Sequence, residues 1–350
     1  MHDALPMISI VTPSYNQAQF LEETILSVLS QDYPSIEYLI IDGGSTDGSV
    51  EIIRKYEDRL AYWVSEPDQG QSHAINKGFQ RANGEILAWL NSDDLYCPGA
   101  VRAAVEFLEL HPDVTLVYGR AEMINVEGAA VQMIPWDDFD PATCIARQRY
   151  PIPQPAAFFR RDAMQRVGLL DEQLYYWMDW DYWIRIGLAG VKVAKIPRIL
   201  ARCRLHRGSK TVGELIRPQE EMVAWVDRFF SRPQSLEIAA FERQSRSRAL
   251  LSLGRQHFYA GQYTSARRAV FRGVSLYPRS LAMDRALWLL ILSILPGPAI
   301  TQILRLRQMC FGLPPALEAR YGMEGNKRGG PPDGGKERAS QGGWHQGSPQ

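Results

Sequence analysis

Four short polar clusters carry the side chains that could do chemistry in this sequence. They lie at 12–16 (TPSYN), 42–48 (DGGSTDG), 66–70 (EPDQG) and 91–94 (NSDD). Each cluster alone is typical of a turn, because Gly, Asn, Asp and Pro are the residues that turns require. Together they hold several carboxylates and no cysteine, and carboxylates held close together repel one another unless a cation is present. The combination indicates a site for a hard divalent ion, Mg²⁺ or Mn²⁺.

Each cluster directly follows an apolar run of strand length. These runs cover 7–13, 37–42, 60–65 and 86–90, a fifth run covers 114–119, and stretches with helical spacing separate them. Such alternation predicts a parallel α/β sheet with helices on both faces. In this architecture the polar site lies at the carboxyl ends of the strands, which is where the four clusters fall.

The clusters, taken in order, resemble the family 2 inverting glycosyltransferases of the GT-A fold. The resemblance covers about residues 7–210 and is carried by SIVTPSYN, IIDGGSTDGS, SEPDQGQSHAINKGF and ILAWLNSDD. It implies an α/β fold with a mixed sheet flanked by helices and a C-terminal helical appendage after it. It also implies a metal-dependent enzyme that moves a sugar from a nucleotide-diphosphate donor, a UDP- or GDP-sugar, to a hydroxyl group of a glycan or lipid-linked acceptor. The expected setting is cell-surface polysaccharide synthesis.

The resemblance assigns a donor and metal site to the cluster residues. The donor-binding residues that it implies are Thr12, Pro13, Tyr15, Asp42, Asp68, Asp93 and Arg204. Asp94, as the last acid of the family's Asp-x-Asp motif, and His206 would hold the Mg²⁺ or Mn²⁺ that bridges the two phosphates. Arg207 and Lys210 would help to clamp the departing diphosphate. The first acid of this motif is replaced by Asn91, so one charge is missing.

An aromatic stretch at 177–183 (WMDWDYW) matches the acidic pair that supplies the family's catalytic base. Asp179 aligns with the base, whereas Met178 replaces the other acid. The surrounding rings would desolvate Asp179 and raise its pKa into a range useful to a base. Trp177 and Trp180 would stack on the acceptor sugar, and Gln154 would face the acceptor from a proline-flanked loop. The structural alternatives are an acid favoured at a helix N-terminus and simple core packing.

The implied reaction is a single displacement. Asp179 would take a proton from the acceptor hydroxyl, and the anomeric configuration would invert. Met178 and Asn91 leave open a catalytically weak or inactive scaffold that binds nucleotide or a partner. A nucleotidyltransferase is disfavoured because no glycine-rich phosphate loop with a basic residue follows the first strand. A dinucleotide-binding oxidoreductase is disfavoured because no G-x-G-x-x-G motif follows a strand.

Composition indicates a globular protein with a large core. The 350 residues are 45% hydrophobic and 22% charged, which excludes a wholly disordered or fibrous chain. A formal net charge of zero disfavours nucleic acid as a partner. The four cysteines are far apart, and the first residues lack the pattern of a secretory signal, so we expect a cytoplasmic location.

The net charge of zero is a cancellation between two parts of the chain. Residues 1–200 hold 16 basic and 28 acidic side chains, a net charge of −12, whereas residues 201–350 carry +12. We expect a glycosyltransferase domain at 1–212, a helical extension at 213–320 and a disordered tail at 321–350. The extension would contain one tetratricopeptide-like hairpin, with an ordinary helical hairpin as the alternative.

An apolar run at 286–295 (ALWLLILSIL) lies in this extension between arginine-rich stretches. It is too short to span a bilayer. Apolar residues flanked by arginine favour peripheral contact with the anionic inner face of a membrane, and a solvated helix face is the alternative.

Overall fold

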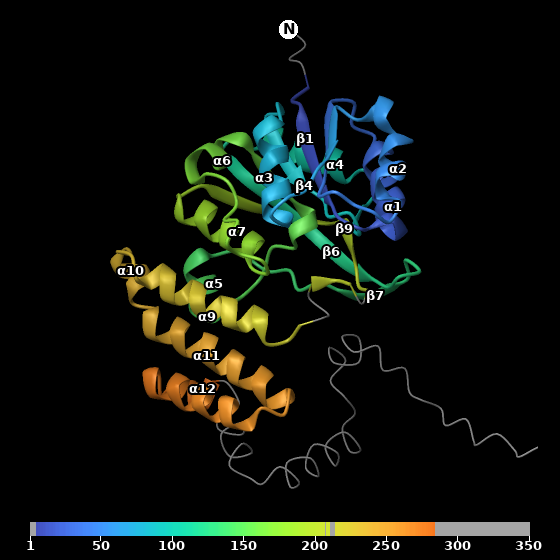
Figure 1. The fold of residues 1–350 in the computed structure, drawn as a ribbon. Coiled ribbons are helices and arrows are strands. Elements are labelled where there is room, and N and C mark those ends of the chain that lie inside the picture. The colour runs from blue at the N-terminus through green and yellow to red at the C-terminus, as the bar shows by residue number, and fades with distance from the viewer. Residues whose placement is uncertain (1–4, 207, 211–213, 284–350) are drawn as a thin grey trace, which may run out of the picture. The chain divides into compact units, whose positions relative to one another are not determined.

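A mixed β-sheet of nine strands is the centre of the structure (Figure 1). The structure is a computed structural model, and it describes residues 5–206, 208–210 and 214–283. All of these residues belong to one compact unit, Met1–Leu304. The strands are β1 Ile8–Ser14, β2 Ile36–Asp42, β3 Tyr62–Ser65, β4 Ile86–Trp89, β5 Leu95–Tyr96, β6 Val114–Ile124, β7 Ala130–Met133, β8 Ala157–Arg160 and β9 Lys192–Arg204.

The sheet is parallel in its first half and mixed in its second. Its order is β3-β2-β1-β4-β8-β6-β9-β5, and β7 pairs with β6. Strands β1 to β4 pair in parallel, as the sequence predicts. The fifth apolar run forms β6, but β8 lies between β4 and β6 and is antiparallel to both. The prediction of a purely parallel sheet is therefore wrong in this half, whereas the mixed sheet implied by the family resemblance is confirmed.

Helices cover both faces of the sheet. Those of the sheet region are α1 Ala18–Leu29, α2 Ser49–Arg54, α3 Gln71–Arg81, α4 Ala100–Leu110, α5 Pro141–Arg147, α6 Arg161–Val167 and α7 Met178–Leu188, with 3₁₀ turns η1 Glu57–Arg59 and η2 Gln154–Ala156. Ile10 and Ile40 belong to the core that includes α1 and α4, whereas the next residues, Val11 and Ile41, belong to the core that includes α3 and α7. The strands are continuously apolar because successive side chains point to opposite faces and both faces are covered.

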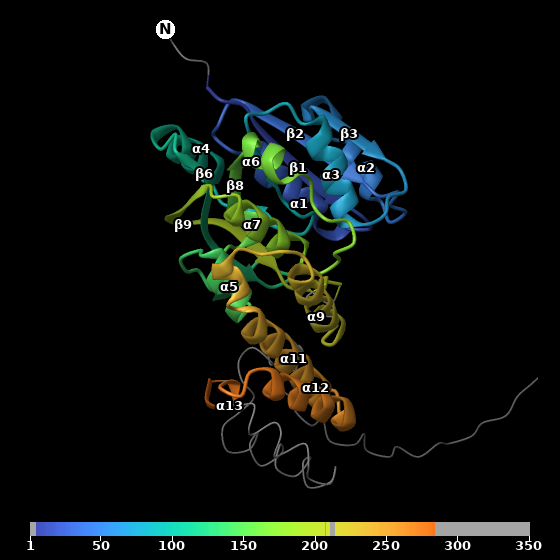
Figure 2. The same cartoon turned by 90° about the vertical axis from the view of Figure 1, so that its left-hand side faces the viewer.

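A group of helices follows the sheet. These helices are α9 Arg217–Phe230, α10 Leu236–Ala239, α11 Glu242–Tyr259, α12 Tyr263–Leu276 and α13 Ser280–Met283. Figure 2 shows α11 and α12 side by side. They approach so closely that a Cβ atom on Gly254 would lie 2.6 Å from Val270 Cγ2. The predicted C-terminal helical part is confirmed, and its kinship to tetratricopeptide repeats stays a prediction.

Several sequence predictions fall outside the described residues. The apolar run at 286–295 and the tail at 321–350 lie there, and so does the domain boundary at 212/213. Within the part that the structure describes, no helix combines the length and the hydropathy needed to cross a bilayer.

Candidate active site

The loops that follow β1, β2 and β3 are joined by side-chain hydrogen bonds. Asn16, in the left-handed region with a φ of 50°, accepts a bond from the Thr46 N–H at 2.9 Å through Oδ1. The Asn16 N–H donates to Ser45 Oγ at 2.8 Å. Ser65, at the end of β3, donates to Asp42 Oδ2 at 2.6 Å. The three predicted clusters therefore form one continuous edge, as the parallel strand order requires.

Asp42 is buried at this edge, and all of its acceptor sites are used by hydrogen bonds within the protein. Its side chain is fully buried, and it accepts hydrogen bonds from the N–H groups of Gly44 and Ser45 and from the hydroxyls of Ser45 and Ser65, at 2.5–3.1 Å. Four donors fill the acceptor capacity of a carboxylate. The contact between Asp42 and the donor that the family resemblance implies stays a prediction.

The first cluster contains two buried residues and the exposed Tyr15. Thr12 and Pro13 are buried, and Thr12 Oγ1 lies 3.1 Å from the hydroxyl of Tyr38. Both residues therefore support the strand end, and their contact with the donor stays a prediction. Tyr15 is 61% exposed at the same edge, so its ring is free to pack against a base.

Asp68 lies over the second cluster in space that Gly43 leaves free. A Cβ atom on Gly43 would lie 2.7 Å from Asp68 Oδ2. Asp68 Oδ1 accepts a hydrogen bond from the Gly70 N–H at 2.8 Å, so the carboxylate is held against the loop after β2. Asp68 therefore lies beside the second cluster, and its contact with the nucleotide stays a prediction.

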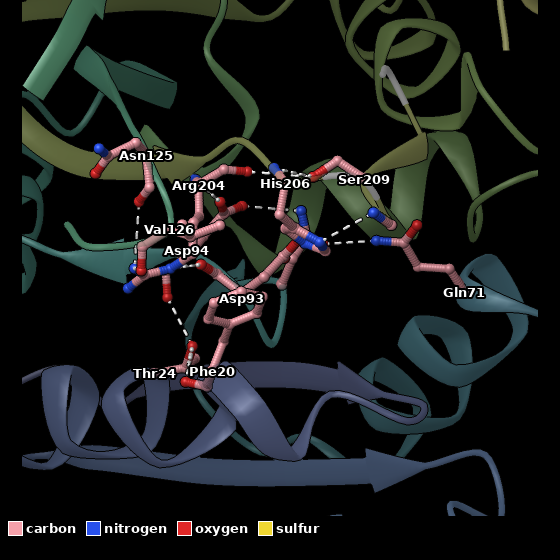
Figure 3. A network of polar contacts seen from close by, with 12 residues as sticks. Phe20, Thr24, Gln71, Asp93, Asp94, Asn125, Val126, Arg204, His206 and Ser209 are labelled. Carbon is pink, nitrogen blue, oxygen red and sulfur yellow. Dashed lines mark hydrogen bonds and ion pairs between the residues drawn. The ribbon is translucent and has the colours of Figure 1, made fainter. Parts of the chain in front are cut away.

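Asp93 and His206 form a carboxylate–imidazole pair (Figure 3). Asp93 Oδ2 lies 2.9 Å from His206 Nε2, and both side chains retain partial exposure, 19% and 11%. His206 also packs against the ring of Phe20, with centroids 4.7 Å apart. The sequence places these two residues 113 positions apart, and the end of β9 brings them together.

Asp94 points away from this pair into the protein. It is 5% exposed, its Oδ1 accepts from the Arg204 N–H at 3.0 Å, and its Oδ2 accepts from Asn91 Nδ2 at 3.0 Å. Burial, together with the charge of Asp93, raises the pKa of Asp94 well above its ordinary value. Both oxygens of Asp94 accept hydrogen bonds from the protein, and the metal-binding role that the family resemblance implies for Asp94 stays a prediction.

The Arg204 side chain is buried, and its guanidinium is bonded to other groups of the protein. Its side chain is 1% exposed and forms an ion pair with Glu23 at 2.6 Å. Its remaining N–H groups donate to the backbone carbonyls of Asp93, Asn125 and Val126 at 2.9–3.4 Å. These bonds hold the guanidinium inside the protein, and the contact between Arg204 and a diphosphate stays a prediction. Arg207 lies outside the described residues.

Lys210 supplies a cation at the open edge. Its Nζ donates to Gln71 Oε1 at 2.7 Å and lies 3.8 Å from the ring centroid of Tyr175. Burial lowers the pKa of Lys210 to about 8, against the opposing charges of Asp179, Glu221, Asp93 and Asp68. The ammonium group is therefore surrounded by the acids of the site.

Hydrogen bonds between side-chain amides connect Lys210 to Gln154 in η2. Gln71 Nε2 donates to Asn91 Oδ1 at 2.6 Å. Asn91 Nδ2 donates to Gln154 Oε1 at 3.0 Å, and Gln154 Nε2 donates to the Trp89 carbonyl at 2.9 Å. Asn91, at the position of the missing acid, therefore connects the fourth cluster to η2. Gln154 is buried and contacts the fourth cluster through its hydrogen bond with Asn91.

Asp179 lies in the first turn of α7, where it is hydrogen-bonded to the half-buried Tyr150. The Tyr150 hydroxyl donates to Asp179 Oδ2, and the Trp180 N–H donates to Oδ1 at 2.7 Å. Burial raises the pKa of Asp179 even though these bonds and the Lys210 charge oppose the rise. A carboxylate with a raised pKa beside open polar groups has the properties of a general base.

The predicted aromatic platform takes a different form. Trp180 is 2% exposed and packs against Trp225 with centroids 4.7 Å apart, so it lies in the core, and its stacking on a sugar stays a prediction. Trp177 is half-buried and donates from Nε1 to the Pro218 carbonyl at 2.5 Å. The exposed ring of this stretch is Tyr175, at 52%.

Sequence reasoning did not identify Tyr150 or Gln71 as site residues. Gln71 lies in the resembling segment, directly after the third cluster, which is the one signal that could have identified it. Tyr150 lies 29 residues before Asp179, and nothing in a single sequence reports that the two side chains meet.

Comparison with known proteins agrees with this geometry. Residues 9–168 match the family model described as glycosyl transferase family 2. An uncharacterized glycosyltransferase of Rickettsia felis is 31% identical over 59% of this chain, and the match spans only 36% of that protein. A putative teichuronic acid biosynthesis glycosyltransferase, TuaG of Bacillus subtilis, is 38% identical over 29% of this chain and 42% of its own length.

Solved structures share the fold at low sequence identity. The UDP-GlcNAc complex of S. aureus TarS has a TM-score of 0.59 and 16% identity, covering 86% of this chain and 92% of that chain. The Pyrobaculum calidifontis mannosyltransferase PcManGT, in complex with GDP-Man and Mn²⁺, has a TM-score of 0.54 and 17% identity, covering 87% of each chain. Residues 9–168 of this chain therefore match glycosyl transferase family 2, and the chain has the GT-A fold.

Proposed function

We propose that this protein transfers a sugar from a nucleoside-diphosphate donor to a hydroxyl group of a glycan or lipid-linked acceptor, with inversion at the anomeric carbon. The observation that carries the proposal is the convergence of an Asp93–His206 pair, Lys210 and the desolvated Asp179 at one edge of the sheet. A role in cell-surface polysaccharide synthesis is supported by the teichuronic acid function given for the similar B. subtilis protein.

Asp93 and His206 would hold the divalent ion, Mg²⁺ or Mn²⁺. A carboxylate oxygen and an imidazole nitrogen 2.9 Å apart are donors that suit Mn²⁺, and both side chains are partly exposed. The described residues contain no group of three His, Cys, Asp or Glu side chains able to hold a metal, so donor phosphates and water would complete the shell. The ion would supply positive charge that stabilises the leaving diphosphate.

Other residues of the edge would bind the donor. Tyr15 is exposed and would pack against the base, and Asp68 would accept hydrogen bonds from the base or the ribose. Lys210 would pair with the diphosphate in place of the buried Arg204, because an ammonium group surrounded by low-dielectric protein attracts a phosphate strongly.

Asp179 would act as the general base. In the reaction the acceptor oxygen loses its proton to the Asp179 carboxylate and bonds to the anomeric carbon, while the bond from that carbon to the donor phosphate breaks. The Tyr150 hydroxyl holds Asp179 Oδ2, which leaves the other oxygen, bonded to the Trp180 N–H, with further acceptor capacity. Exposed Tyr175 would contact the acceptor sugar in place of Trp180.

The helical part would contact an anionic membrane surface from the cytoplasmic side. Residues 243–283 contain eight arginines and no acid. On α12 the exposed side chains include Arg267, Arg268 and Arg272, together with Phe271, which is 68% exposed. An aromatic ring among arginines suits the headgroup region of an anionic bilayer.

A donor screen tests the enzymatic proposal. Thermal unfolding is measured with UDP, GDP, UDP-GlcNAc and GDP-mannose, each with and without Mn²⁺, and release of nucleotide is measured for each sugar donor. We expect one nucleotide to stabilise the protein more with Mn²⁺ than without it, and its sugar derivative to be hydrolysed slowly. Stabilisation with no turnover of any donor would favour the alternative of an inactive nucleotide-binding scaffold.

A further inference from the structure

Helix α9, which follows the sheet region, holds the loop that leads into Asp179 through hydrogen bonds. Glu221, in α9, accepts hydrogen bonds from three consecutive backbone N–H groups, those of Tyr175, Tyr176 and Trp177, at 2.8–2.9 Å. These groups immediately precede α7, whose first turn carries Asp179. One carboxylate thus fixes three peptide units next to the proposed base. Hydrogen bonds to a charged acceptor are stronger than those between neutral groups.

Further polar contacts connect α9 to the same region. Trp225 Nε1 donates to the buried Asp181 Oδ1 at 2.7 Å. Arg228 pairs with Asp171 at 2.7 Å, and Trp177 Nε1 donates to the Pro218 carbonyl at 2.5 Å. The segment 171–181 is therefore anchored to α9 by polar contacts along its whole length.

The loop at 175–177 also contacts a group of the site other than the base. The Tyr175 carbonyl accepts from Lys210 Nζ at 3.3 Å, and the Tyr175 ring lies under the same ammonium group. Displacement of this loop would therefore move the acceptor-side ring, the cation and the base together. A shift of about 1 Å in such groups is enough to slow a reaction about a hundredfold.

We propose that Glu221 is a positioning residue for glycosyl transfer, and that α9 completes the catalytic site from outside the sheet domain. The inference rests on the proposed function, since it assigns Asp179 as the base. It gives the helical part a direct effect on catalysis in addition to any role in membrane contact.

Three variants at two adjacent residues separate this role from general stability. Glu221→Ala removes the acceptor of all three N–H groups, and Glu221→Gln retains one carbonyl oxygen for them. Glu220→Ala, at an exposed position of the same helix, is the matched control. Hydrogen–deuterium exchange of the peptide covering 174–181 and hydrolysis of the donor found in the screen are measured on the full chain.

We expect Glu221→Ala to lose amide protection at 175–177 and about tenfold or more in kcat for hydrolysis, with nucleotide affinity within about twofold of wild type. Glu221→Gln should fall between Ala and wild type, and Glu220→Ala should match wild type. Normal turnover in Glu221→Ala, or unchanged exchange at 175–177, would overturn the inference.

The pH profile gives a readout that loss of stability alone would not change. The titratable groups that interact with Asp179 are Tyr150, Cys203 and Lys210. Since burial raises the Asp179 pKa, water entering beside a loosened loop should move the acid limb of kcat/KM to lower pH in Glu221→Ala. An acid limb at the wild-type pH would contradict the positioning role. If the wild-type chain hydrolyses no donor, the proposed function fails and takes this role with it, while amide exchange still reports whether Glu221 holds the loop.

Discussion

At the scale of single residues, the adjacent carboxylates Asp93 and Asp94 have opposite surroundings. Asp93 faces His206 at the open edge, whereas Asp94 is enclosed by Asn91 and the Arg204 backbone. We expect Asp93→Asn and His206→Ala to weaken Mn²⁺-dependent stabilisation by nucleotide at least about tenfold, because each removes a ligand. Asp94→Asn should retain it.

Thermal unfolding with nucleotide and a Mn²⁺ titration measures this difference. Retained Mn²⁺ response in Asp93→Asn, together with its loss in Asp94→Asn, would support the assignment that the sequence favours.

Removal of the Asp179 charge should affect chemistry and spare binding. The amide in Asp179→Asn can still accept from Tyr150 but cannot take a proton, so we expect kcat to fall about 10²–10⁴-fold. Nucleotide affinity, measured by calorimetry, should stay near the wild-type value. Turnover within a few-fold of wild type would rule out Asp179 as the base.

Lys210 should set the basic limb of the pH profile. Burial lowers its pKa to about 8, so the free enzyme carries the ammonium charge below that pH and loses it above. Because kcat/KM reports the free enzyme, we expect it to decline above about pH 8. Lys210→Arg stays charged and should remove this decline, whatever its effect on the maximum rate. A basic limb that is identical in the two proteins would assign the titration to another group.

At the scale of elements, the contact between α7 and α9 is a buried polar interaction inside an aromatic core. Asp181 is 6% exposed, accepts from Trp225 Nε1 and pairs with Arg185 at 2.8 Å. Trp225→Phe would leave one carboxylate oxygen without its donor. We expect it to lower the free energy of unfolding by about 1–3 kcal/mol more than a matched Trp→Phe change that breaks no hydrogen bond.

Trp183 provides that matched change. It is 2% exposed, and its Nε1 has no hydrogen-bond partner in the part of the chain that the structure describes. Urea unfolding of Trp225→Phe and Trp183→Phe gives the comparison. Equal losses in the two variants would show that only ring area is involved and that the bond to Asp181 contributes little.

At the scale of the whole molecule, the charge is divided between an acidic sheet region and a basic helical region. Residues 1–200 carry −12 and residues 201–350 carry +12. Electrostatic attraction to an anionic bilayer amounts to about 1 kcal/mol for each basic residue near the surface. Arg267→Glu, Arg268→Glu and Arg272→Glu combined should therefore abolish binding to vesicles of phosphatidylglycerol and phosphatidylcholine.

The control variant reverses the charges of Arg54 and Lys55, two exposed basic residues at the C-terminal end of α2. Co-sedimentation at low and physiological salt measures binding, and the control should sediment like wild type. No binding by wild type, or equal binding by both variants, would refute a membrane contact through α12.

The sequence by itself determined the sheet edge and predicted a reaction class for it. Turn residues after apolar runs place the loops of Asn16, Asp42, Asp68 and Asp93 together, and this holds in the structure because strand alternation and turn chemistry are local properties. The position of Asp179 at the start of α7 also follows from a local pattern.

Only the tertiary structure decided which of these side chains are open. Asp42 is saturated by Ser45 and Ser65, and Arg204 is enclosed by contacts from three other segments. Glu221 meets its three N–H partners from 44–46 residues away. Residue type and spacing report which chemistry a side chain can do, but its direction and exposure depend on long-range packing, and that packing decides whether the side chain binds a ligand or the protein itself.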